Sequence, residues 1–178
     1  MIDQHRFAKR RDRFLAGLAG NAAIIPAAST VTHHADCEYP FRQNSDFWYL
    51  TGFDEPDAVA LFLPQRPLGE QFVLFVLPKD EVLEAWNGFR FGTERAVNQF
   101  GADIAHPIED FSRLLGDYLK GAKGIAFRVG KHPKIEPIVL KALNDQLDMV
   151  QRSGSCAFSL LAPCPFLHQL RLYKDAWE

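Results

Sequence analysis

Two apolar runs in the first half of the chain constrain its fold most strongly. They span residues 58–63 and 72–77, and each is apolar at consecutive positions. A strand with one solvated face alternates apolar and polar residues, so continuous runs predict strands that are buried on both faces, as in a sheet covered by helices. The connector between the runs contains Pro67 and Gly69, which favour a tight loop and therefore adjacent antiparallel strands.

Helical and strand-like segments alternate along the rest of the chain. Amphipathic patterns predict helices over residues 3–19, 107–119 and 133–149, and a shorter helix over 93–100 with Thr93 as its cap. Short apolar segments predict further strands over residues 22–26, 124–129 and 156–161. The remaining segments are a predicted loop over 27–43, a stretch without a clean period over 79–92, and a connector or short helix over 165–173. This order predicts one α/β domain with three layers, a mixed β-sheet flanked by helices.

Composition and charge exclude several classes of protein. The formal net charge of −2 argues against a nucleic-acid-binding surface, and the basic run at residues 9–13 is interpreted as the solvated face of the first helix. No apolar stretch reaches the roughly 18 residues that a membrane span requires, and no signal-peptide pattern is present. Cys37, Cys156 and Cys164 are an odd number without close pairing. Free thiols in a reducing compartment are therefore favoured, and we expect a cytoplasmic protein.

The residue types that carry chemistry form no recognised catalytic motif. A phosphate-binding glycine loop, a nucleophile elbow and a zinc-type His/Glu motif are all missing from the sequence. Residues 33–38 combine His, Asp, Cys and Glu, but adjacent histidines point in different directions, so a polar loop is favoured over a metal site. His106, His132 and His168 lack partners at useful spacing and are interpreted as surface or capping residues. By themselves, these residues predict an α/β domain without a visible active site.

An aromatic-rich stretch before the first apolar run carries the most specific signal. Asn44 or Ser45 can cap a short helix, and Gly52 can supply the left-handed conformation at its end. Phe47 and Leu50 are one turn apart and would share a buried face. The full stretch is Arg42-Gln43-Asn44-Ser45-Asp46-Phe47-Trp48-Tyr49-Leu50-Thr51-Gly52-Phe53.

This stretch closely resembles the signature of the amino-terminal domain of Xaa-Pro aminopeptidases (aminopeptidase P), a domain that prolidases and creatinases share. The signature residues are Arg42, Asn44, Asp46, Trp48, Tyr49, Gly52 and Phe53. Three further segments match in the expected order: the lead-in at 36–44, a tryptophan-bearing loop at 84–88, and a joining segment at 167–174. The resemblance covers essentially the whole chain and implies the creatinase/prolidase amino-terminal fold.

In that family a metallopeptidase domain follows, binds two divalent ions, often manganese, and releases an N-terminal residue that precedes proline. The resemblance implies that residues 1–165 are the amino-terminal domain and that 166–178 begin a connector to a catalytic domain outside this chain. The chain by itself is then expected to hold no metal, to contain no catalytic residue and to be inactive. The implied partners are its own carboxy-terminal catalytic domain, a peptide substrate and further copies in a dimer or tetramer, with no nucleic acid and no membrane.

Trp86 is the residue to which the resemblance assigns a role near substrate, as an apolar wall at the active-site entrance. The alternative is a loop tryptophan packed on its own domain. Arg42, Asn44 and Asp46 are interpreted as fixing the loop and the helix cap. Two other assignments stay open: the amino-terminal domain of a prolidase or creatinase relative, and a non-catalytic interaction module with the same fold.

Overall fold

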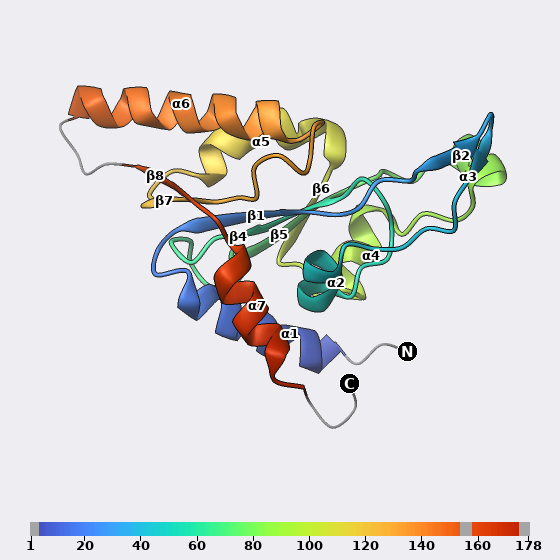
Figure 1. Cartoon of the computed structure of the whole chain (residues 1–178), viewed down its shortest axis with the longest axis horizontal. Coiled ribbons are helices and arrows are strands. Elements are labelled where there is room, and N and C mark those ends of the chain that lie inside the picture. Colours follow the sequence, from blue (N-terminus) through green and yellow to red (C-terminus); the bar gives the residue numbers. More distant parts are fainter. Residues whose placement is uncertain (1–3, 154–157, 175–178) are drawn as a thin grey trace.

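The structure is a computed structural model that describes residues 4–153 and 158–174. In these residues a six-stranded mixed sheet lies between two layers of helices (Figure 1). Its strands are β1 (Ala22–Pro26), β4 (Val59–Phe62), β5 (Phe72–Val76), β6 (Ile104–Pro107), β7 (Gly124–Ala126) and β8 (Ser159–Leu161). The predicted three-layer fold class is therefore confirmed.

The strand directions create one edge at which most strands end. The order is β6-β5-β4-β1-β7-β8, and β4 runs antiparallel to both β1 and β5. The other pairs in this sheet are parallel. Consequently β1, β5, β6, β7 and β8 all end at the same side, which we call the carboxyl edge. Loops that follow parallel strands meet at such an edge, which is where open α/β sheets bind ligands.

Helices cover each face of the sheet and bury it. The first face carries α1 (Gln4–Gly17), α2 (Ser45–Thr51), α4 (Gly92–Asn98) and α7 (Cys164–Leu172). The second face carries α5 (Phe111–Tyr118), preceded by the 3₁₀ turn η1 (Ile108–Asp110), and α6 (Glu136–Ser153). Along β4, Ala60 and Phe62 pack into the first layer, while Val59 and Leu61 pack into the second. Burial on both faces, predicted from the continuous apolar runs, is thus confirmed.

The basic run of the first helix is a solvated face only in part, which corrects the interpretation above: Lys9 and Arg13 are exposed, whereas two arginines between them are buried. Arg10 is 3% exposed and Arg11 is also buried. The guanidinium of Arg10 lies 4.1 Å from the ring of Tyr49 and donates to its carbonyl oxygen, while Arg11 donates to the carbonyl oxygen of Leu50. These carbonyls belong to the last turn of α2, where cations satisfy free acceptors and oppose the helix dipole. Burial lowers the pKa of Arg11 to about 10, so it still carries its charge at neutral pH.

Several local expectations need correction. Residues 27–43 contain the hairpin of β2 (Thr32–His34) and β3 (Cys37–Glu38) instead of a plain loop. The stretch without a period contains α3 (Glu81–Asn87), and β6 was not predicted at all. Thr93 is not the cap of α4, because this helix begins at Gly92 and Phe91 precedes it without a side-chain bond. Of the predicted connector or short helix over 165–173, residues 165–172 lie in α7, so the helical alternative holds. The start of the predicted last strand, 156–157, lies outside the described residues.

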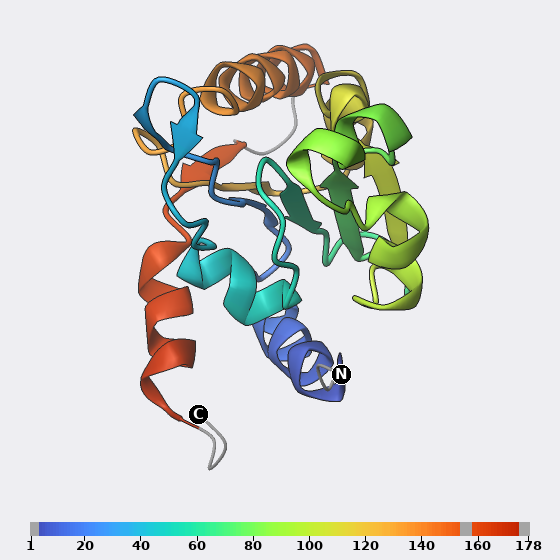
Figure 2. The same cartoon turned by 90° about the vertical axis from the view of Figure 1, so that its right-hand side faces the viewer.

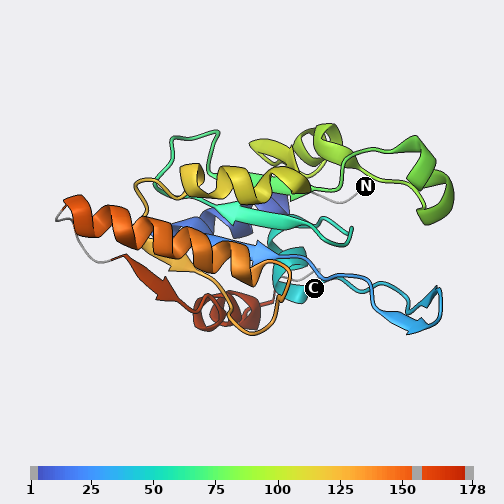
Figure 3. The ribbon, with the colours of Figure 1, turned by 90° about the horizontal axis from the view of Figure 1, so that it is seen from above.

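Burial explains why the sequence pattern does not predict these elements. Each residue of β2 and β3 is exposed, and α3 exposes its apolar side chains, so neither has a buried face to impose a period. β6 is a half-buried edge strand ending at Pro107, a position where a residue without an N–H is tolerated. The hairpin and α3 both extend beyond the carboxyl edge as two separate projections (Figures 2 and 3).

Candidate functional site

A cleft of about 1050 Å³ opens at the carboxyl edge, between the two layers of helices. Its walls come from the segment after β1, the lead-in to α2, the loop between β7 and α6, and the beginning of η1 and α5. Three signature residues, Arg42, Asn44 and Asp46, line it. The structure thus brings the most distinctive part of the sequence to the edge where α/β sheets bind ligands.

The signature forms a short helix whose two ends are fixed by its own residues. Asn44 caps α2, because its Oδ1 accepts from the Asp46 N–H at 2.9 Å. Gly52 ends the helix in the left-handed conformation, with φ 65°, and its N–H donates to the Trp48 carbonyl at 2.8 Å. Phe47 and Leu50 are fully buried below the helix. The local sequence therefore determines both the length and the buried face of α2.

Gln43 is a central residue of this site for which the sequence analysis proposed no role. Its side chain is 8% exposed, and its Oε1 accepts from the N–H groups of Ala28 and Asn44, both at 2.8 Å. Its Nε2 donates to the carbonyl oxygens of Phe53, at 3.2 Å, and Glu55, at 2.8 Å. One amide thus joins the segment after β1, the start of α2 and the turn after α2. The sequence gives no signal for this role, because a glutamine inside a polar loop does not reveal that its side chain is buried.

The signature helix is also tied to α7. Asp46 Oδ1 accepts from Arg171 Nη1 at 2.5 Å, and the Tyr49 hydroxyl donates to the Leu170 carbonyl oxygen at 3.0 Å. Arg42, by contrast, is exposed and makes no hydrogen bond or ion pair with the described residues. Asn44 and Tyr49 therefore bond to backbone groups and Asp46 pairs with the Arg171 side chain, while Arg42 lies exposed at the cleft.

α7 crosses the expected boundary at residues 165 and 166. Leu167 is buried in the first core layer, where Phe166 and Leu170 also pack. The proposed end of the domain at residue 165 stays a prediction, and residues 175–178 of the expected connector lie outside the described residues.

Trp86 lies on a second feature of this edge, the α3 arm, which we define as residues 79–91. Its indole is 85% exposed, so it does not pack on its own domain in this chain. Val82, Leu83 and Phe89 are also exposed on the arm. Clusters of exposed apolar side chains mark surfaces that contact other molecules or domains. The arm therefore presents an unburied apolar surface, and its backbone projects beyond the carboxyl edge (Figure 1).

Glu55 fixes the base of the α3 arm. Its Oε1 accepts from the Phe91 N–H at 2.6 Å, whereas its Oε2 is buried and has no partner among the described residues. Burial raises the pKa of Glu55, and the Phe91 N–H and the nearby Arg90 act in the opposite direction. Arg90 also donates to the Pro78 carbonyl oxygen at 3.3 Å. Both ends of the arm are thus held to the domain although its tip is exposed.

The raised pKa of Glu55 predicts a measurable pH dependence of stability. The folded state binds this proton more tightly than the unfolded state, so the free energy of unfolding falls as pH rises from the ordinary glutamate pKa, about 4.3, through the raised folded value. Glu55→Gln keeps an acceptor for the Phe91 N–H without the charge and should flatten this decline.

Glu55→Ala should be less stable than Glu55→Gln by about 1–2 kcal/mol, because it leaves that N–H unpaired. Urea unfolding measured between about pH 4 and about pH 8 tests this prediction. Parallel pH profiles of the free energy of unfolding for wild type and Glu55→Gln would contradict it.

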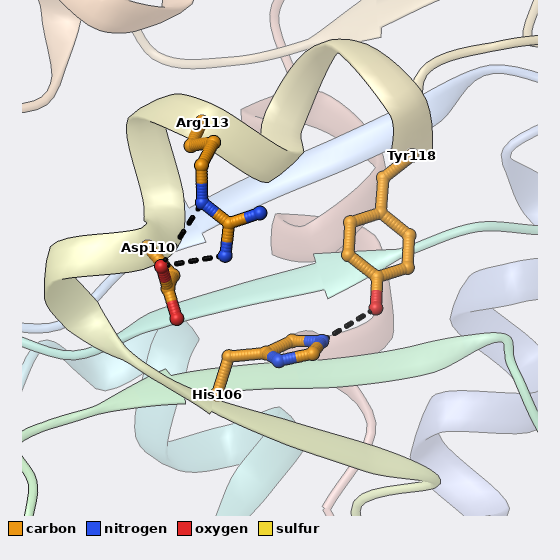
Figure 4. A network of polar contacts seen from close by, with 4 residues as sticks. All are labelled: His106, Asp110, Arg113 and Tyr118. Carbon is orange, nitrogen blue, oxygen red and sulfur yellow. Dashed lines mark hydrogen bonds and ion pairs between the residues drawn. The ribbon is translucent and has the colours of Figure 1, made fainter.

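A polar group on the second face of the sheet holds β6 to α5 (Figure 4). His106 Nε2 and the Tyr118 hydroxyl are 2.7 Å apart, and Arg113 pairs with Asp110 at 2.7 Å. Burial lowers the pKa of His106 and raises the pKa of Tyr118, so both are neutral at pH 7. A neutral imidazole and a phenol satisfy one another, and neither residue lines the cleft. We assign this group a structural role.

The histidines near the hairpin form no metal centre in the part of the chain that the structure describes. No group of three or more His, Cys, Asp or Glu side chains is placed there to hold a metal ion. His33 and His34 lie on β2, exposed, with the ring of His33 in edge contact with Tyr39 at 4.6 Å. Cys37 is an exposed free thiol.

No helix among the described residues is long and apolar enough to cross a membrane.

Comparison with known sequences identifies a family, and two relatives illustrate the match. Residues 7–126 match the family described as aminopeptidase P, N-terminal domain. The chain is 33% identical over 178 residues to the Xaa-Pro aminopeptidase of Escherichia coli, covering 99% of this chain and 40% of that protein. It is 41% identical over 120 residues to the Xaa-Pro aminopeptidase of Haemophilus influenzae, covering 67% of this chain and 28% of that protein. The chain thus spans at most two fifths of the length of these relatives.

Solved structures give the same result for the fold. The aminopeptidase PepP of Pseudomonas aeruginosa matches with a TM-score of 0.87 and 34% identity, over 98% of this chain and 40% of that one. A zinc-substituted E. coli aminopeptidase P in complex with product matches with the same TM-score, identity and coverage. The fold of this chain therefore occurs in these enzymes as part of a longer chain.

Proposed function

Because this chain belongs to the family of aminopeptidase P N-terminal domains, we propose that it serves as the amino-terminal domain of a metal-dependent Xaa-Pro aminopeptidase. Such an enzyme releases an N-terminal residue that precedes proline. The domain itself contributes no catalytic group in this proposal. It supports assembly into a dimer or tetramer and forms part of the entrance to the active site. The catalytic domain of the same protein and a peptide substrate are its partners.

The exposed Trp86 is the observation that carries this proposal. A largely exposed indole on a helix whose base is held by Glu55 and Arg90 has a defined position but is not buried by any of the described residues. Large aromatic side chains in such positions contribute most when a partner buries them. A catalytic domain, of this or a neighbouring subunit, would supply that partner, and the indole would then form an apolar wall beside the substrate.

The metal ions of the proposed enzyme would be held outside this domain. The described residues offer no group of ligands for them. We propose two divalent ions, with manganese as the physiological metal; the zinc-substituted E. coli relative supports metal dependence in general. The exposed free thiol of Cys37 fits a reducing compartment, so we place the protein in the cytoplasm.

Hydrolysis of a short Xaa-Pro peptide tests the proposal. We would compare the 178-residue chain with a chain extended through the following part of its reading frame, both with added manganese. Activity of the extended chain alone is the expected result. Activity of the short chain would show that this domain carries a catalytic site, and inactivity of both would favour a non-catalytic interaction module.

Trp86→Ala should lower the activity of the extended enzyme without lowering the stability of the domain. Since the indole is exposed, we expect the free energy of unfolding to change by less than about 0.5 kcal/mol. In the extended enzyme we expect kcat/KM for an Xaa-Pro peptide to fall about tenfold, mainly through KM, because the apolar wall is lost. Leu68→Ala is the matched control: its side chain is even more exposed, but it lies in the connector between β4 and β5, at the opposite edge. Equal losses for both variants would contradict the role of Trp86.

A further inference from the structure

The cleft at the carboxyl edge carries an excess of positive charge that the domain itself does not neutralise. Two carboxylates line it, and each is already paired. Asp46 pairs with Arg171 at 2.5 Å, and Asp57 pairs with Lys134 at 3.4 Å while also accepting from the Ser29 hydroxyl at 2.6 Å. The remaining cations of the cleft are Arg42, Arg128 and Lys131, and none of them has a hydrogen bond or ion pair with the residues that the structure describes.

The inner wall of the same cleft is apolar. The side chains that form it are Val31, Leu77, Ile108, Phe111, Ile135 and Ile138. Apart from Val31, these side chains are buried or half-buried, so the wall is a concave surface between the layers and not a flat patch. A volume of about 1050 Å³ lies just above the usual range for small-molecule pockets, about 300–1,000 Å³.

Apolar walls with a few charged groups at one side select ligands that are amphiphilic. Guanidinium groups bind phosphate oxygens in a bidentate way, and a lysine adds a point charge. Three unpaired cations suit a group with two negative charges better than a single carboxylate. We infer that this cleft is a binding site for a small organic phosphate, whose phosphate contacts Arg42, Arg128 and Lys131 and whose apolar part lies against the wall formed by α5 and α6. This site is separate from the α3 arm and does not depend on peptide hydrolysis.

His132 provides a reporter inside the cleft. It lies in the loop between Arg128 and Lys134, and burial and the charge of Arg128 lower its pKa, while Glu136 acts in the opposite direction. A dianion beside Arg128 would oppose that lowering and raise the pKa of His132. His106 is the matched internal control, because burial lowers its pKa as well but it does not line the cleft.

Calorimetric titration of the 178-residue chain with 1-naphthyl phosphate tests the inference, with 1-naphthol and inorganic phosphate as separate probes of the two halves of the ligand. We expect 1-naphthyl phosphate to bind at least tenfold more tightly than either half. Arg128→Gln combined with Lys131→Gln should weaken it at least tenfold. Arg113→Gln combined with Lys120→Gln, an equal change in charge on exposed ion pairs outside the cleft, should leave affinity within twofold.

Proton NMR titration supplies the second measurement. Saturating 1-naphthyl phosphate should raise the pKa of His132 and leave that of His106 unchanged. The inference is overturned if 1-naphthyl phosphate does not bind at millimolar concentration, if inorganic phosphate binds equally well, or if both pairs of substitutions weaken binding alike. It is also overturned if both histidines shift together, since that would indicate a general effect of ionic charge.

Discussion

Replacing Gln43 with leucine lowers the free energy of unfolding by about 3–5 kcal/mol, which is the largest effect we expect from a single polar substitution in this chain. Leucine has nearly the same volume but no polar atoms. The N–H groups of Ala28 and Asn44 and the carbonyl oxygens of Phe53 and Glu55 would all lose their partner at once. A buried polar group without a partner has lost its hydrogen bonds to water and gained none in return, so its desolvation cost is uncompensated. This is why the loss of four modest bonds adds up to a large effect.

Gln146→Leu is the control for Gln43→Leu. Gln146 is buried to the same extent, 8% exposed, but makes one bond in the described structure, from its Nε2 to the Gly116 carbonyl oxygen at 3.3 Å. We expect a loss of about 1 kcal/mol there. Urea unfolding followed by circular dichroism gives both values. Similar midpoints for the two variants would show that Gln43 does not hold the three segments together.

Gly52→Ala is expected to destabilise the domain by about 2–4 kcal/mol through two separate costs. A non-glycine residue at φ 65° costs about 1 kcal/mol. The added Cβ would also lie 2.8 Å from the ring of Phe7, which is 2% exposed and in edge contact with Trp48 at 5.5 Å. Since that ring cannot move into solvent, α1 and α2 would have to separate slightly.

Gly69→Ala isolates the backbone cost. Gly69 also has positive φ, 88°, but a Cβ there meets no atom within 4 Å, so we expect a loss of only about 1 kcal/mol. Phe7→Leu in combination with Gly52→Ala should be less destabilising than the sum of the two single variants, because the smaller side chain removes the close contact. Strict additivity, or equal losses at Gly52 and Gly69, would contradict the proposed collision with Phe7.

The layers of the fold could be predicted from the sequence because burial imposes periodicity. The strands at residues 58–63 and 72–77 and the helices of the second layer were predicted for this reason, and the structure confirms them. The basic run was misinterpreted in part, at its two buried arginines, because charge was weighed above position. Arg10 and Arg11 lie three and four residues after Phe7, on its buried side of α1, where guanidinium groups can reach the carbonyls of α2. The spacing of three and four residues from Phe7 was therefore enough to predict that these two arginines are buried.

The candidate site was predictable only where it coincides with the signature. Asn44 and Gly52 occupy positions that local rules identify, so the ends of α2 could be predicted. The cleft could not, since Arg128 and Lys131 are 86 and 89 residues from Arg42 and come together only because β1 and β7 are neighbours. Gln43 and Glu55 were missed for a related reason: their partners are backbone groups, which every sequence contains.

The position of β1 determines the order in which this domain can be completed during synthesis. β1 is the first strand made, yet it lies inside the sheet between β4 and β7. Its second neighbour exists only after Ala126 has been added, and α1 lacks its contact with α7 until Leu167 has left the ribosome. The rings of the first core layer, Phe14 among them, therefore stay incompletely covered for most of translation. Such late closure is typical of sheets with distant parallel partners, and it exposes the growing chain to aggregation and to chaperones.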